Sequence, residues 1–101
     1  MSSIIVNKDN LNELKRDSKP LLLDFYAEWC GPCRSVLPII EAIAKERSDI
    51  NVGKINVDKE SALAGEYGVY SIPTLVVIKG GEVVKKVSGA RSKADILALL
   101  N

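Results

Sequence analysis

The sequence predicts an α/β protein with a mixed sheet of about five strands flanked by four helices. Three observations predict this class. Apolar segments typical of strands alternate with segments of helical period over the first two thirds of the chain, a glycine pair joins two further strands, and a capped apolar segment ends the chain. With 101 residues, 47% hydrophobic and 27% charged, we expect one domain over residues 1–101, without internal repeats.

Each expected element has a local signal in the sequence. In chain order we expect a strand at 3–6, a helix to about 16, a strand at 21–27, a helix to about 47, a strand at 51–57, a short helix at 59–66, strands at 74–79 and 82–88, and a final helix. Asn7 or Asp9 can cap the first helix. Strands linked by helices in this order pair in parallel, with right-handed crossovers.

The second strand, residues 21–27, is apolar on both alternating faces except at Asp24. This pattern is typical of a central strand that is covered on both sides. In the helix that follows, Glu41 and Lys45 have the spacing of an outward-facing ion pair. Pro38 falls inside that helix, so we expect a kink there.

The last third of the chain has a different pattern. Gly80 and Gly81 form a two-residue link that suits a hairpin with a primed turn, so the strands on either side must be antiparallel. Ser92 and Asp95 have the spacing of a capping box, which predicts the start of the final helix.

Charge and composition argue against several classes of protein. Fourteen Lys and Arg against thirteen Asp and Glu give a net charge of +1 without a basic patch, so we expect no nucleic-acid partner. The apolar runs are far shorter than the roughly 18 residues of a membrane span. The N-terminus lacks the basic start of a secretory signal, although a processed chain would look the same, and we expect a cytoplasmic location. The absence of histidine excludes Ser/His/Asp and Cys/His catalysis.

Both cysteines of the chain lie three residues apart, in Cys30-Gly31-Pro32-Cys33. Proline is tolerated in the first turn of a helix, and the spacing allows a disulfide. This disulfide would stabilise the fold little. Loop-closure entropy gives a stabilisation of about 1.9 kcal/mol for a four-residue loop, against about 4.7 kcal/mol for a hundred-residue loop. The pair is better explained by redox switching. A zinc half-site is the alternative, but no further Cys or His could complete it, so we expect no metal.

The position of each cysteine predicts its role. A sulfur at a helix N-terminus faces unpaired amides and the positive end of the helix dipole, which favour the thiolate. We therefore expect Cys30 to be an exposed attacking nucleophile and Cys33, one turn further, to be the shielded resolving thiol. Asp24 should be partly buried, which raises its pKa. Resolution by Cys33 needs a base, and because histidine is absent the proton must pass to a carboxylate, Lys, Tyr, Cys or water.

Over essentially its whole length the sequence resembles the thioredoxin family. The matching residues are Asp24-Phe25-Tyr26-Ala27-Glu28-Trp29-Cys30-Gly31-Pro32-Cys33, Pro38, Lys54, Asn56-Val57-Asp58, Tyr67-Gly68-Val69, Ser71-Ile72-Pro73-Thr74 and Gly89-Ala90. Tyr26 and Arg34 depart from the family pattern, in which Trp and Lys are usual at these positions. The resemblance implies the thioredoxin fold, with strand order 1-3-2-4-5, and a monomer that reduces disulfides in protein substrates.

The resemblance also implies how the protein is recycled and where protons move. The chain would bind no cofactor and would receive electrons from a separate, NADPH-dependent thioredoxin reductase. Asp24 would be the base that exchanges a proton with Cys33 through water, and Lys54 would lie nearby and take part in this transfer. The alternative is a structural ion pair between Asp24 and Lys54. Pro32 and Gly31 would shape the cysteine turn, with Pro38 nearby.

Substrate binding is likewise implied by the resemblance. Trp29 would be a contact surface rather than ordinary core, and Pro73 would follow a cis peptide bond beside the cysteines. Because proline lacks an N–H, the backbone of Ile72 would be free to pair with an extended substrate segment. The expected groove is lined by Trp29, Ser71, Ile72, Gly89 and Ala90.

Two other functions stay open at this point. The reduced fold could serve as a binding module on a partner enzyme, or the protein could be an oxidase or isomerase. The Gly-Pro pair between the cysteines favours a reductant, because oxidising relatives often carry a histidine there. The three tyrosines, Tyr26, Tyr67 and Tyr70, are interpreted as packing residues.

Overall fold

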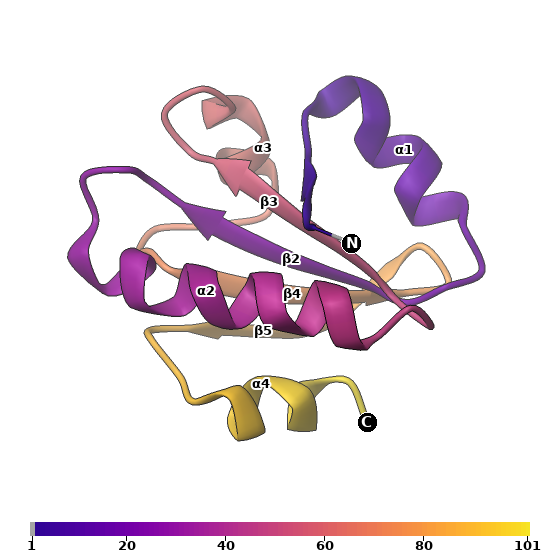
Figure 1. Ribbon diagram of the computed structural model, residues 1–101. Coiled ribbons are helices and arrows are strands. Elements are labelled where there is room, and N and C mark those ends of the chain that lie inside the picture. Colours follow the sequence, from indigo (N-terminus) through magenta and orange to yellow (C-terminus); the bar gives the residue numbers. More distant parts are fainter. Residues whose placement is uncertain (1) are drawn as a thin grey trace.

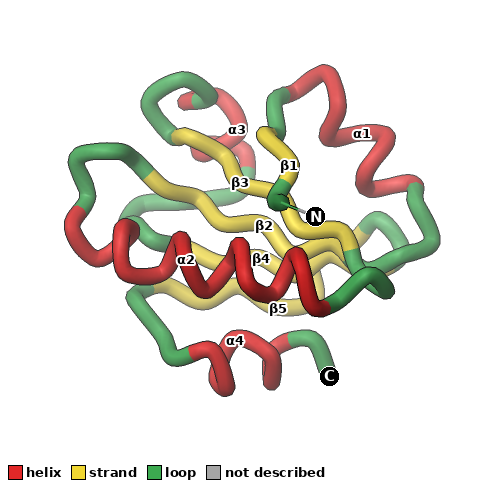
Figure 2. Tube along the Cα trace, in the orientation of Figure 1, coloured by secondary structure: helices red, strands yellow, loops and turns green. Residues whose placement is uncertain are grey.

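The computed structural model describes residues 2–101 as a mixed sheet with helices on both faces (Figure 1, Figure 2). The elements are β1 (Ile4–Ile5), α1 (Lys8–Arg16), β2 (Leu21–Tyr26), α2 (Gly31–Glu46), β3 (Asn51–Asn56), α3 (Ser61–Glu66), β4 (Thr74–Lys79), β5 (Glu82–Ser88) and α4 (Lys93–Leu99). The strand order is β1-β3-β2-β4-β5, which confirms the predicted order. β1 and β2 run parallel to β3, whereas β4 is antiparallel to both β2 and β5.

The central strand β2 separates two apolar cores. Leu21, Leu23 and Phe25 pack with residues of α1 and α3, while Leu22 packs with residues of α2 and α4. The two pairs of helices lie on opposite faces of the sheet in Figure 1. This arrangement confirms a central strand covered on both sides. Because side chains alternate along a strand, Asp24 belongs to the face that α2 and α4 cover.

Helix α2 begins at the cysteine turn and continues through Pro38, and the kink predicted there stays a prediction. The expected ion pair between Glu41 and Lys45 is wrong. The carboxylate of Glu41 accepts hydrogen bonds from Lys54 of β3 and from Ser3 instead. Helical spacing showed which side chains share a face of α2, but it could not show that β3 and the segment before β1 supply the partners of Glu41.

The hairpin between β4 and β5 has the predicted turn. Gly80 and Gly81 have φ angles of 61° and 81°, the left-handed values that a primed turn needs. At α4 the hydroxyl of Ser92 accepts a hydrogen bond from the Asp95 N–H at 3.2 Å, so the predicted cap is present. A reciprocal capping box occurs at α1 instead, where Asn7 is the cap. In the described part of the chain no helix is long and apolar enough to cross a membrane.

Candidate functional site

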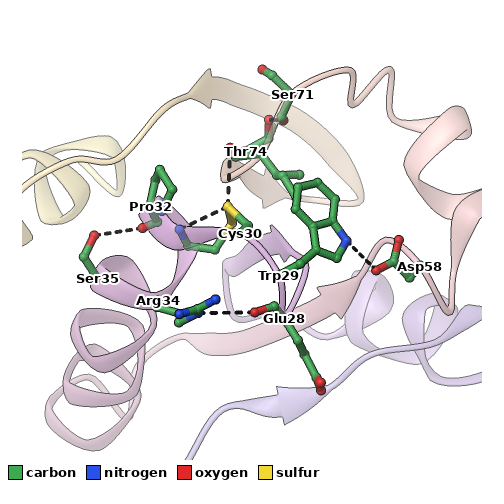
Figure 3. The surroundings of a disulfide bond; sticks show 11 residues. Glu28, Trp29, Cys30, Pro32, Arg34, Ser35, Asp58, Ser71 and Thr74 are labelled. Atoms are coloured by element: carbon green, nitrogen blue, oxygen red, sulfur yellow. Dashed lines mark hydrogen bonds between the residues drawn. A yellow bond between two sulfur atoms is a disulfide. The ribbon is translucent and has the colours of Figure 1, made fainter.

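The cysteine turn connects the carboxyl end of β2 to the start of α2. Cys30 and Cys33 form a disulfide with a Cα–Cα distance of 5.3 Å. Cys30 is the N-cap of α2, and its Sγ accepts a hydrogen bond from the Cys33 N–H at 3.2 Å (Figure 3). Pro32 occupies the first turn of the helix, where an N–H would have no partner within the helix. The turn therefore directs backbone N–H dipoles at the sulfur of Cys30.

Both cysteines are buried in the disulfide form. Cys30 is 5% exposed and Cys33 is 2% exposed, so the expectation of an exposed Cys30 is wrong for this redox state. The sulfur of Cys30 is bonded to Cys33 and lies 3.8 Å from the backbone oxygen of Ile72. Ala27 completes the small apolar cluster around the two cysteines. The sulfur has no proton in a disulfide, so the approach to Ile72 is a contact and not a hydrogen bond.

Asp24 is completely buried, with 0% exposure. Within residues 2–101 neither oxygen of its carboxyl group has a hydrogen-bond partner. Burial raises the pKa of Asp24 to about 7; the positive charge of Lys54 lowers it, and the negative charge of Glu41 raises it. A carboxyl group with this pKa can take up or release a proton near neutral pH.

Lys54 lies beside Asp24 in the register of β2 and β3 but pairs with a different carboxylate. Its Nζ atom lies 3.3 Å from Oε2 of Glu41. The alternative interpretation, a structural ion pair between Asp24 and Lys54, is therefore wrong. The structure leaves Asp24 without a direct cationic partner, although Lys54 is close enough to affect its pKa.

A pocket of about 270 Å³ opens beside the cysteine turn and contacts both Cys33 and Lys54. The residues that line it are Tyr26, Ala27, Glu28, Cys33, Arg34, Leu37 and Lys54. The pocket has room for water, which can hydrogen-bond to polar groups at its wall. Arg34 and Tyr26, the two departures from the family pattern, both line this pocket.

A second pocket, of about 180 Å³, contains part of the expected groove. It is lined by Trp29, Val57, Val69, Tyr70, Ser71 and Ile72. Thus Trp29, Ser71 and Ile72 come together as expected, whereas Gly89 and Ala90 are not among the lining residues. The peptide bond between Ile72 and Pro73 is cis, as the resemblance implies, and Pro73 is buried. The N–H of Gly89 donates to the backbone oxygen of Pro73 at 2.8 Å.

Aromatic side chains are exposed at this pocket. Trp29 is 66% exposed, which shows that ordinary core packing is the wrong interpretation for it. Its indole Nε1–H donates to Oδ2 of Asp58 at 2.8 Å (Figure 3). Tyr70 is 94% exposed, so its interpretation as a packing residue is also wrong. Tyr67 does pack, with its ring 5.8 Å from that of Phe25.

Sequence reasoning missed Asp58 and Tyr70 as site residues. β2 and β3 are parallel, so the cysteine turn after β2 and Asp58 after β3 lie at the same end of the sheet. This shared position could have identified Asp58 from the sequence. Tyr70 had only its proximity in sequence to Pro73 as a signal. Across residues 2–101 no cluster of three or more His, Cys, Asp or Glu side chains could hold a metal ion.

Known proteins show the same sequence pattern and the same fold. A family model described as Thioredoxin matches residues 2–101. The thioredoxin of Streptomyces clavuligerus is 51% identical over 85 residues, which cover 84% of this chain and 79% of that protein. A protein of Mycobacterium leprae named bifunctional thioredoxin reductase/thioredoxin is 47% identical over 81 residues, which cover 79% of this chain and 18% of that protein. A solved mutant thioredoxin from Halobacterium salinarum NRC-1 has a TM-score of 0.89 at 39% identity, covering 97% of this chain and 86% of that chain.

Proposed function

The chain belongs to the thioredoxin family and is a thiol-disulfide oxidoreductase, and we propose that Cys30 and Cys33 perform different steps in reducing a protein disulfide. One observation carries this assignment of roles. The Sγ atom of Cys30 caps α2 and accepts a hydrogen bond from the Cys33 N–H at 3.2 Å. Amide dipoles at this position stabilise negative charge on sulfur, so Cys30 is suited to be the thiolate.

In the first step the thiolate of Cys30 attacks one sulfur of the substrate disulfide. The substrate S–S bond breaks, a new bond joins Cys30 to the substrate, and the other substrate sulfur leaves as a thiolate that takes up a proton. The protein and its substrate are then joined by a mixed disulfide. Cys33 is buried in the first turn of α2, which keeps its thiol close to Cys30 for the next step.

In the second step Cys33 loses its proton to the carboxylate of Asp24, with water as the carrier. Cys33 and Lys54 line the pocket from which this water would enter, whereas Asp24 is fully buried and is not among the lining residues. The Cys33 thiolate attacks the sulfur of Cys30, the mixed disulfide breaks, and the substrate sulfur leaves and is protonated. Two electrons have then passed from the two thiols to the substrate. The Cys30–Cys33 disulfide that the structure contains is the product of this step.

The apolar pocket lined by Trp29, Ser71 and Ile72 supports an extended protein segment as the substrate. Ile72 lies against the sulfur of Cys30, and Pro73 lacks the N–H that would otherwise compete with a substrate strand. Trp29 and Ser71 border this groove, and we extend it past Pro73 to Gly89 and Ala90, which follow β5. The exposed rings of Trp29 and Tyr70 at this pocket are of the aromatic type that is enriched in protein interfaces.

The cycle needs a source of electrons, because each turnover leaves the cysteines oxidised. We propose a separate, NADPH-dependent thioredoxin reductase as this source, supported by the Mycobacterium leprae relative whose name combines both activities. The chain itself would then bind no cofactor. We further propose that residues 1–101 act as one domain and as a monomer in the cytoplasm.

The assignment of the two cysteines is tested by trapping. A Cys33→Ser variant keeps the attacking thiol but cannot resolve the mixed disulfide, so it should accumulate covalent complexes with protein substrates. A Cys30→Ser variant, which keeps only the resolving thiol, is the matched control. The proteins captured by each variant are released with a reductant, then identified and quantified by mass spectrometry. Equal capture by the two variants would contradict the proposed roles.

A further inference from the structure

Three polar residues, Ser3, Glu41 and Lys54, form a chain of hydrogen bonds from the N-terminal segment to the strand beside Asp24. The backbone N–H and the hydroxyl of Ser3 each donate to the carboxylate of Glu41 at 2.7 Å. Glu41 binds the ammonium group of Lys54 at 3.3 Å. Lys54 in turn is the residue of β3 that lies beside Asp24 in the sheet. Segments far apart in the sequence therefore meet at the proton-exchanging side of the site.

We propose that Glu41, fixed in place by Ser3, is a positioning residue that keeps the ammonium group of Lys54 from pairing directly with Asp24. This inference deepens the proposed function and depends on the role assigned to Asp24 there. A lysine bound directly to Asp24 would hold that carboxyl group in its ionised form and make it a weak base. Because Glu41 takes the hydrogen bond from Lys54, Asp24 can bind and release a proton near neutral pH.

The state of Glu41 agrees with this role. Its burial raises the pKa of Glu41, but the bonds from Ser3 and Lys54 outweigh that effect, so the pKa lies below its usual value. The carboxylate is therefore ionised at neutral pH and can hold the ammonium group. Two bonds from Ser3 also fix its position, which one bond to a flexible lysine would not do.

Few other charged groups can act on Asp24. Lys54 comes from β3 and Glu41 from α2, whereas β4 places the apolar Leu75 beside Asp24. α4 contributes the apolar Ile96 to this face of the sheet. The remaining titratable groups nearby are the two cysteines after reduction, and Tyr26, Glu28 and Arg34, which line the same pocket as Lys54. Of these three, Tyr26 is half-buried, and Glu28 and Arg34 are exposed. Glu41 and Lys54 are thus the charged residues whose replacement should change the titration of Asp24.

The test follows the titration of Asp24 in the oxidised protein, where the cysteines do not titrate. The carboxyl ¹³C chemical shift of Asp24 is measured against pH by NMR. Glu41→Gln should lower the titration midpoint by about one pH unit, because it removes a negative charge and frees Lys54 to approach Asp24. The matched control is Glu46→Gln. Glu46 is on the same helix as Glu41 and forms a surface ion pair with Lys93 of α4, so its replacement removes an equal charge and should leave the midpoint unchanged. An unchanged midpoint in Glu41→Gln would overturn the proposal.

Three further variants separate positioning from a direct effect of charge. Ser3→Ala should lower the midpoint by less than Glu41→Gln does, while Ser2→Ala, at an exposed neighbouring position, should not change it. Lys54→Met should raise the midpoint. The effect of Glu41→Gln should be much smaller in the Lys54→Met background; an undiminished effect there would show that Glu41 acts only through its own charge, and would reject the positioning role.

The activity of Asp24→Asn distinguishes this inference from the function on which it rests. If Asp24→Asn reduces disulfides as fast as the parent protein, Asp24 is not the base, and the proposed second step fails. The NMR titration of the Glu41→Gln variant is independent of that result. A shifted midpoint would still support the positioning of Lys54 by Glu41.

Discussion

Two regions near the Cys30–Cys33 disulfide, called here the groove side and the proton side, differ in charge and in exposure to solvent. The groove side, formed by Trp29, Tyr70 and Ile72, is apolar and carries exposed aromatic rings. The proton side, formed by Asp24, Lys54 and Glu41, has a buried carboxyl group and an ion pair. The difference shows how a short turn can serve two tasks: one side recognises a protein segment, and the other side exchanges a proton with the resolving thiol.

Replacing the attacking cysteine should have the largest effect, because both sides of the site act through it. We expect Cys30→Ser to reduce the rate of disulfide reduction by about 10³-fold or more, since a hydroxyl group cannot replace the thiolate. An insulin reduction assay with dithiothreitol as electron donor measures this loss against the uncatalysed rate.

The double variant Cys30→Ser, Cys33→Ser tests whether the chemistry is needed at all. A chain that serves only as a binding module on a partner enzyme would keep its biological function in this variant. Complementation of cells that lack the natural protein would then succeed without any disulfide reduction, and the proposed function would be wrong. Failure of the double variant, with the parent chain as control, supports the redox cycle.

The proton side should also determine how stability depends on pH. The pKa of Asp24 is about 7 in the folded protein and 3.8 in the unfolded reference, so the unfolded chain releases this proton at lower pH. The folded state therefore loses stability as pH rises from about 4 to 7, by about 4 kcal/mol in total, and changes little above that range. Asp24→Asn removes this titration and should be more stable than the parent protein at pH 8 but not at pH 4.

Chemical denaturation of the oxidised proteins at pH 4, 6 and 8 measures this prediction. The quantity to compare is the difference in unfolding free energy between variant and parent at each pH, because other groups titrate equally in both proteins. A difference in unfolding free energy that stays constant from pH 4 to pH 8 would mean that folding does not raise the pKa of Asp24. Asp49→Asn is a suitable control, since Asp49 lies at the surface beside Arg47.

On the same side, Asp24→Asn should slow catalysis. We expect disulfide reduction to fall by about 10²-fold, because the amide cannot accept the proton of Cys33. The loss should appear in the resolving step and not in the attack by Cys30, which stopped-flow measurement of mixed-disulfide formation and decay can separate. Unchanged turnover between pH 6 and pH 9 would remove the base role from Asp24.

The sequence was sufficient to predict the elements whose signals are local. The apolar residues on both faces of the segment around Asp24 predicted a central strand, and Gly80-Gly81 predicted the hairpin turn, because backbone conformation and burial pattern depend on neighbouring residues. The same reasoning placed Asp24 in an apolar strand and predicted that its pKa is raised. The cysteine turn was likewise visible in four consecutive residues.

Contacts between distant elements were harder to predict. Helical spacing suggested that Glu41 pairs with Lys45, but the nearest cation is Lys54 on β3 and the nearest hydroxyl is that of Ser3. Which of several possible partners a charged side chain finds depends on how the helix sits on the sheet, and a one-dimensional pattern does not contain this information. The exposure of Tyr70 was missed for the same reason.

On the groove side the effects should be smaller and should depend on the substrate. Trp29→Ala removes a large exposed ring next to Cys30, and we expect about a tenfold loss in kcat/KM for a protein disulfide. The loss should be close to zero for a small disulfide such as oxidised glutathione, which cannot cover the groove. Equal losses for both substrates would show that Trp29 acts on the cysteines themselves and not on substrate binding.

The smallest predicted effect concerns the hydrogen bond that orients Trp29. Asp58→Ala removes the acceptor of the indole N–H, and we expect a loss of about fivefold in kcat/KM for a protein substrate, equivalent to about 1 kcal/mol. The reason is that the ring must then be ordered when substrate binds, instead of being held in place beforehand. A double-mutant cycle with Trp29→Phe tests this reason, because Phe keeps an aromatic ring but has no N–H to donate. In the Trp29→Phe background Asp58→Ala should have no further effect, whereas an undiminished effect would mean that Asp58 contacts the substrate directly.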